Sequence, residues 1–191
     1  MRKKGLQFYK KRKKLNMNLA KEIGSWLIGG LVAVFLAIFM TFFFGAQVSI
    51  IGVSMESELQ NGQIVLVNQL VYDFVKPGRG DVIAFLPNGN HNSHYYVKRI
   101  IGLPGDQIQI KNGFVYINDE LLEESYDQIS DGGMAKVELI IPENEYFVLG
   151  DNRNNSEDSR ASTIGMVSST SILGKVWLHF PYGDETIGFV D

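Results

Sequence analysis

The 191-residue sequence contains no cysteine. Disulfide bonds, thiolate catalysis and cysteine zinc sites are therefore excluded, and the fold must be held by packing alone. The absence fits an extracytoplasmic domain that does not depend on oxidation, and it fits the cytosol equally well. Cysteine usage therefore leaves the compartment open.

Charge is missing from one long stretch, because no charged residue lies between Glu22 and Glu56. As a helix, the mostly apolar residues 23–44 would span roughly 33 Å, enough to cross the hydrocarbon core of a bilayer. A cleavable signal sequence is the alternative, but the apolar region of such a sequence is shorter than residues 23–44. In addition, a cut after Ala46 would put bulky Phe44 where a small residue is needed. We predict a transmembrane anchor over residues 23–44.

Positive charge gathers ahead of this stretch, within the first 21 residues, although the whole chain has a net charge of −3. A basic head can indicate nucleic-acid binding, but this one ends against a membrane-length apolar run rather than a basic face with aromatic residues. We therefore expect no nucleic-acid partner. By the positive-inside rule, residues 1–22 stay in the cytoplasm, and residues 45–191 form an extracytoplasmic domain on a single-pass anchor in the cell membrane.

Beyond the anchor, short runs of Val, Ile, Phe and Tyr recur between turn residues without a helical period, which predicts one mainly β domain. Asn112-Gly113 predicts a tight hairpin, because the favoured turn needs a positive φ at both positions. The acidic residues 119–136 predict a solvated excursion rather than a chemical site. The predicted strands cover residues 64–67, 81–85, 107–110, 114–117, 137–141, 146–150 and 176–180.

Histidine is scarce, although it is the usual base for a serine nucleophile. His91 and His94 lie in a polar stretch that predicts an exposed loop, and His179 lies in an apolar terminal run. None of them offers the histidine-plus-carboxylate arrangement of a Ser-His-Asp site. His91 and His94 are also the candidates for a metal site, but two histidines without further ligands are weak support, and we predict no metal.

Two polar segments carry the remaining candidates. Lys98 stands among aromatic and β-branched residues, and burial there could lower its pKa by several units, although a surface lysine is the alternative. Arg99 is interpreted as an ion-pairing group, because a guanidinium cannot usefully deprotonate. Residues 150–160 predict a hydrogen-bonded loop; a calcium loop is the alternative, which Arg153 and Arg160 disfavour.

Five segments in order, namely the anchor, GVSM (52–55), RGDVIAF (79–85), YYVKRIIGLPGD (95–106) and GDNRNNSEDSR (150–160), make the chain resemble a type I signal peptidase of the single-anchor, Gram-positive kind. The resemblance implies an N-terminal transmembrane helix followed by a β-rich extracytoplasmic serine peptidase domain. It implies an endopeptidase that removes signal peptides from exported preproteins without a cofactor. The implied partners are preproteins, membrane lipid and a nearby secretion translocase.

The resemblance also implies a Ser-Lys dyad, with Ser54 as nucleophile and Lys98 as general base within hydrogen-bond reach. Ser156 would help to orient the lysine, and Asp158 and Arg160 would form a supporting pair. The Ser54 N–H would stabilise the oxyanion. Shallow apolar pockets for small residues at the first and third positions before the cut would be lined by Ile50, Met55, Leu59, Tyr96 and Val97.

The chain departs from the family pattern on both sides of the nucleophile. Gly52 stands where some relatives supply a second oxyanion donor, a serine hydroxyl. In place of a proline-containing turn, the chain has Glu56, Ser57 and Glu58. The loss of the proline should loosen the turn after the nucleophile, and the two glutamates could hold Lys98 in its charged form. The alternatives are a catalytically weak or silent relative that acts as a chaperone for surface proteins, and a protease that cleaves itself or a regulator. The anchor and the lack of a DNA-binding segment count against the latter.

Overall fold

The computed structural model describes residues 17–44, 46–90, 93–183 and 186–190. The chain divides into two compact units, residues 1–39 and 40–191. Helix α1 (Met17–Phe44) occupies the described part of the first unit and runs into the second. Among the described residues, one helix is long and apolar enough to cross a membrane, over Met17–Met40, and none of its most apolar window is buried. An apolar helix without a packed face is a candidate membrane anchor.

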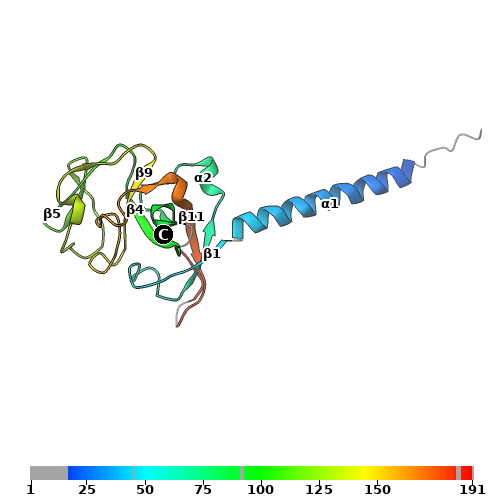
Figure 1. Ribbon diagram of the computed structural model, residues 1–191. Coiled ribbons are helices and arrows are strands. Elements are labelled where there is room, and N and C mark those ends of the chain that lie inside the picture. Colours follow the sequence, from blue (N-terminus) through cyan, green and yellow to red (C-terminus); the bar gives the residue numbers. More distant parts are fainter. Residues whose placement is uncertain (1–16, 45, 91–92, 184–185, 191) are drawn as a thin grey trace, which may run out of the picture. The chain divides into compact units, whose positions relative to one another are not determined.

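The second unit is mainly β, as predicted (Figure 1). Its described strands form an eight-stranded antiparallel sheet in the order β1-β2-β11-β3-β4-β9-β10, with β12 paired to β11, and a four-stranded sheet in the order β7-β6-β5-β8. The larger sheet contains β1 (Ala46–Ser49), β2 (Ile64–Asn68), β3 (Val82–Phe85), β4 (Tyr96–Gly102), β9 (Glu145–Leu149), β10 (Val167–Ser168), β11 (Ile172–His179) and β12 (Gly188–Phe189). The smaller sheet contains β5 (Gln107–Lys111), β6 (Phe114–Ile117), β7 (Glu120–Leu121) and β8 (Leu139–Ile140). Short helical turns are α2 (Val71–Phe74), η1 (Pro87–Gly89), η2 (Gly133–Lys136) and η3 (Ser169–Ser171).

Each run predicted as a strand contains one, and the hairpin at Asn112-Gly113 is confirmed. The two residues have φ values of 52° and 83° and join β5 to β6, with Lys111 paired to Phe114. Five described strands were not predicted: β4, β1 and the two-residue strands β7, β10 and β12. β4 is buried along most of its length between β3 and β9, although it contains Lys98 and Arg99.

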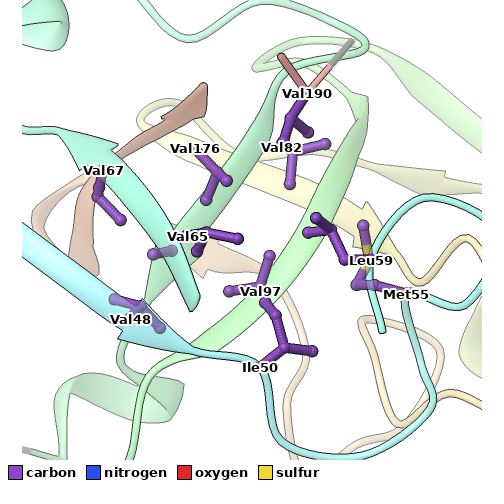
Figure 2. Close-up of a cluster of buried hydrophobic side chains, with 11 residues drawn as sticks. Val48, Ile50, Met55, Leu59, Val65, Val67, Val82, Val97, Val176 and Val190 are labelled. Atoms are coloured by element: carbon purple, nitrogen blue, oxygen red, sulfur yellow. The ribbon is translucent and has the colours of Figure 1, made fainter. Parts of the chain in front are cut away.

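A buried apolar cluster packs against the larger sheet beneath the turn that contains Ser54. It includes Met55 and Leu59 from that turn and Val97 from β4, and Figure 2 shows these side chains close together. Met55 and Leu59 are 0% and 1% exposed. These two side chains therefore anchor the turn to the apolar side chains of the strands.

The prediction of a solvated excursion at residues 119–136 is wrong in part. Ile129 and Ala135 are buried in the core of the smaller sheet. Glu124 forms an ion pair with Arg153, whose side chain is fully buried. The acidic composition does indicate a surface segment, but its inner face packs on the domain and supplies a counter-charge to the loop of residues 150–160.

Candidate active site

Ser54 lies in the turn that joins β1 to β2. The Glu56 N–H donates to the Val53 carbonyl at 3.1 Å, and the Leu59 N–H donates to the Met55 carbonyl at 2.8 Å. These bonds wind the chain tightly around Ser54, while the buried Met55 and Leu59 side chains fix the turn to the core. The Ser54 hydroxyl is thus presented by a well-anchored segment.

Lys98 lies in the middle of β4, opposite Ile83 of β3, and is only 4% exposed. Its Nζ donates hydrogen bonds to Ser54 Oγ at 2.7 Å and to the Val97 carbonyl at 3.2 Å. Nζ also lies 5.4 Å from the centre of the Tyr96 ring. The two residues singled out in the sequence, 44 positions apart, are therefore in direct contact.

Burial makes the neutral form of Lys98 more accessible than that of an ordinary lysine. Burial lowers the pKa of Lys98 from its ordinary value of 10.5 to about 8, because the ammonium loses its hydration. The carboxylates of Asp158, Glu157 and Asp151 act in the opposite direction and raise the pKa, in that order of strength. At a pKa of about 8, roughly a tenth of the molecules carry a neutral Lys98 at pH 7, enough for it to accept a proton.

Two of these carboxylates are bound to arginines. Arg99 Nε and Nη2 donate to the two oxygens of Asp151, each at 2.8 Å, so the prediction that Arg99 forms an ion pair is confirmed. Arg160 Nε and Nη2 likewise donate to the two oxygens of Asp158, each at 2.8 Å. Such bidentate pairs are strong and directional. They fix the loop of residues 150–160 and offset much of the negative charge behind Lys98.

The same loop is hydrogen-bonded to the backbone around Ser54. The Asn152 N–H donates to the Ser54 carbonyl, and Asn152 Nδ2 donates to the Val53 carbonyl, each at 3.1 Å. Gly150 makes this approach possible, since a β-carbon there would clash with the Ser54 carbonyl and the Ser156 hydroxyl. Backbone contact with the loop therefore places Ser54, in addition to the packing of its own turn.

A cavity of about 270 Å³ opens onto Ser54. Leu59 does not line it, because its side chain packs in the core beside Met55 (Figure 2). Leu59 borders a separate cavity formed by residues 56–61. The polar side chains His94, Asn155 and Glu157 border the Ser54 cavity together with the dyad. The predicted pocket residues that line it are Ile50, Met55, Tyr96 and Val97.

A family model described as signal peptidase, peptidase S26, matches residues 23–181. The chain belongs to this signal peptidase family. It is 35% identical over 184 residues to signal peptidase I S of Bacillus subtilis (strain 168), which covers 88% of this chain and 95% of that protein. It is 33% identical over 189 residues to signal peptidase IB of Staphylococcus aureus (strain MRSA252), which covers 90% and 96% respectively. A crystal structure of a signal peptidase I from Enterococcus faecalis V583 shares 35% identity, with a TM-score of 0.43 over 53% of this chain and 97% of that one.

Membership of the signal peptidase family supports a peptidase that removes signal peptides.

Ser156 lies in the GDNRNNSEDSR segment, and it was expected to help orient Lys98. Here the Ser156 Oγ is buried and has no hydrogen-bond partner among the described residues. The expected hydrogen bond to Lys98 is thus not formed in this structure. Buried hydroxyls without a partner are uncommon. The Ser156 hydroxyl and the Ser54 carbonyl both lie next to Gly150, and the role of Ser156 in orienting Lys98 stays a prediction.

Neither described histidine, His94 or His179, is a partner in the Ser54–Lys98 hydrogen bond of this signal peptidase family member. His91 lies outside the described residues. The His94 ring stacks on Tyr96 with 5.3 Å between ring centres, and His179 Nδ1 lies 2.8 Å from Gln63 Nε2. In the described part of the chain, no group of three or more His, Asp or Glu side chains is placed to hold a metal ion.

The glutamates after the nucleophile, Glu56 and Glu58, could hold Lys98 in its charged form, but neither is among the main contributors to its pKa. The carboxylates with the largest effect on Lys98 lie in the loop of residues 150–160 instead. The Glu58 carboxylate instead favours the charged form of Arg99. Between the two glutamates, Ser57 has a φ of 104°, a strained value for a residue with a side chain.

Sequence reasoning missed the role of Asn152, although the residue lies inside the GDNRNNSEDSR motif. We expect Asn152→Ala to lower kcat about 10-fold with little change in KM, because small displacements of a nucleophile are costly while the pocket is untouched. The comparison variant is Asn154→Ala, since Asn154 bonds Ser130 and the Gln128 carbonyl rather than the turn of Ser54. Steady-state cleavage of a preprotein measures both constants. Equal losses in the two variants would indicate that Asn152 acts only through the stability of the loop.

Proposed function

We propose that the protein is a membrane-anchored serine endopeptidase that removes N-terminal signal peptides with a Ser54–Lys98 dyad. In this proposal residues 1–22 are cytoplasmic, residues 23–44 span the membrane, and residues 45–191 act outside it. The hydrogen bond of 2.7 Å between Lys98 Nζ and Ser54 Oγ carries the proposal, because a nucleophile and its base must be within such reach. The family membership supports the substrate class.

In the first step, neutral Lys98 accepts the Ser54 proton along the hydrogen bond that joins them. Ser54 Oγ then attacks the scissile carbonyl, and the new C–O bond gives a tetrahedral oxyanion that the Ser54 N–H stabilises. When this species collapses, the C–N bond breaks, and the Lys98 ammonium returns the proton to the leaving amine of the mature protein. The signal peptide remains bound to Ser54 as an ester.

In the second step, Lys98 accepts a proton from a water molecule, whose oxygen attacks the ester. The collapse releases the signal peptide as a carboxylic acid, and Lys98 returns its proton to Ser54 Oγ. The cycle is closed without a cofactor. Asp158 and Arg160 support the position of the loop behind Lys98, and Asn152 supports the position of the Ser54 backbone.

The cavity at Ser54 suits a substrate with small side chains before the cut. Its volume of about 270 Å³ is at the low end for a ligand site, and Ile50 and Val97 contribute apolar walls. The anchor would hold this cavity beside preproteins whose own apolar segments occupy the same bilayer, so positioning adds to the chemistry. Membrane lipid and a nearby translocase are the partners this arrangement calls for.

Incubation of the detergent-solubilised full chain with a preprotein tests the proposal. We expect a single cut after a small residue, found by N-terminal sequencing of the product, and a transient signal-peptide ester on Ser54, found by mass spectrometry after acid quenching. Orientation is tested separately by protease protection of the domain in sealed inverted vesicles. Binding of preproteins without cleavage under several conditions would instead favour the chaperone.

The pH dependence of cleavage is a further prediction. Since neutral Lys98 is the base, kcat/KM should rise with pH to a half-maximal value near pH 8, the pKa of Lys98 in the fold. At pH 6 the rate should be about 100-fold below its plateau. Circular dichroism over the same pH range controls for unfolding. A midpoint near 6.5 would point to a histidine base, and one above 10 to a lysine that is not desolvated.

A further inference from the structure

Glu157 occupies a distinct electrostatic position in the Ser54 cavity. Among the described residues that line the cavity, Lys98 and Glu157 are the only lysine, arginine or carboxylate side chains. Lys98 contacts Ser54 and is largely buried, whereas Glu157 is exposed. A peptide that enters the cavity therefore meets the carboxylate of Glu157 as the accessible charge.

The neighbouring carboxylates are already paired with arginines, and that of Glu157 is not. Asp151 and Asp158 are bound by Arg99 and Arg160 in bidentate pairs. Glu157 has no ion-pair partner among the residues that the structure describes. Its negative charge is thus available to a ligand.

The Glu157 carboxylate is also held in place. Thr163 Oγ1 donates to Glu157 Oε1 at 2.8 Å, which restricts the side chain on the rim of the cavity. The charge reaches the reacting atoms as well, because the Glu157 carboxylate raises the pKa of Lys98. A fixed, accessible charge in a partly enclosed site attracts an opposite charge more strongly than a mobile surface charge does.

We propose that Glu157 makes the enzyme prefer preproteins that carry a lysine or arginine close to the scissile bond. The inference rests on the proposed signal-peptide cleavage and adds a specificity determinant to it. His94 and Tyr96, whose rings stack on each other, line the same cavity and give it aromatic surface that the stem of such a side chain can contact. Glu157 would then bind the cationic end.

The test uses preproteins that differ at one position, with lysine or glutamine placed in turn at each of the four residues on either side of the cut. The quantity of interest is the ratio of kcat/KM for the lysine and glutamine members of a pair. An effect of Glu157 on Lys98 changes both rates alike, so the ratio reports only the contact with the substrate. At one or more positions we expect a ratio of about 3 to 10 for the unsubstituted protein, which shrinks in high salt.

Glu157→Gln should bring this ratio to about one, and Glu157→Lys should invert it. Glu56→Gln is the matched control, because it removes the same charge from an exposed residue near Ser54. Glu56 borders the separate cavity of residues 56–61 and not the Ser54 cavity. It should leave the ratio unchanged. Thr163→Val, which releases the carboxylate without removing its charge, should give an intermediate ratio.

A ratio of one at every position, or a preference that survives Glu157→Gln, overturns the inference. Ser54-dependent cleavage of the glutamine substrates with no lysine preference would leave the proposed function intact and refute only the role of Glu157. Failure of the unsubstituted protein to cleave any substrate, or cleavage that persists in Ser54→Ala, would refute the proposed function itself.

Discussion

Replacement of Lys98 by methionine should lower kcat for preprotein cleavage by at least about 10⁴-fold, as expected when one member of a two-residue catalytic unit is lost. Methionine has nearly the same length and apolar character as the lysine stem, so the buried position in β4 stays filled. Ser54→Ala should have an equally large effect, and the double variant should lose no more than either single one. The measurement is single-turnover cleavage with excess enzyme.

Lys111→Met is the matched control for this experiment. Lys111 also lies over an aromatic ring, with Nζ 5.3 Å from the centre of Tyr116, but its side chain is 41% exposed and it belongs to the smaller sheet. Activity close to that of the unsubstituted protein is expected. Lys98→Met protein that keeps a native circular dichroism spectrum and still cleaves at a comparable rate would refute the dyad.

The ion pair between Arg99 of β4 and Asp151 is expected to contribute strongly to the stability of the domain. Asp151→Ala should lower the free energy of unfolding of the domain by about 3–5 kcal/mol, because it leaves the largely buried guanidinium of Arg99 without its counter-charge. Urea unfolding followed by tryptophan fluorescence measures the loss. The side chains of Arg99 and Asp151 are 9% and 1% exposed, so solvent cannot take over the role of the lost carboxylate.

Two further variants separate the charge effect from packing. The double variant Arg99→Met with Asp151→Leu removes both charges and should recover much of the loss, since apolar replacements of a buried pair are often neutral. Lys136→Met, which breaks an exposed pair with Asp131, should leave unfolding nearly unchanged. Full stability of Asp151→Ala would show that Arg99 finds another partner.

Much of the fold could be predicted because alternating Val, Ile, Phe and Tyr mark strands with one buried face. β4 was not predicted as a strand, because it is buried along most of its length and contains Lys98 and Arg99, whose charges sequence patterns assign to the surface. Lys98 is hydrogen-bonded to Ser54, 44 positions away, and Arg99 is paired with Asp151, 52 positions away. Long-range partners of this kind leave no periodic signal.

The site was predictable to a similar extent. Ser54 and Lys98 could be paired only because whole motifs match one family, since each residue is ordinary by itself. Asn152 and Glu157 were quoted within a motif but received no role, because their contacts depend on how the loop folds against other segments. Leu59 was expected to line the pocket, but in this turn it faces the core instead.

The segment between β7 and η2 resembles, from its composition, a surface loop that could be shortened when the enzyme is reduced to a smaller soluble form. Glu124 in that segment is paired with the fully buried Arg153, and Ser130 bonds Asn154 through both its N–H and its hydroxyl. Arg153 also lies over the Tyr126 ring, 4.1 Å from its centre. Anyone engineering a minimal version of the domain would therefore have to keep this stretch, or supply a new anion for Arg153, even though it lies outside the five segments that carry the resemblance.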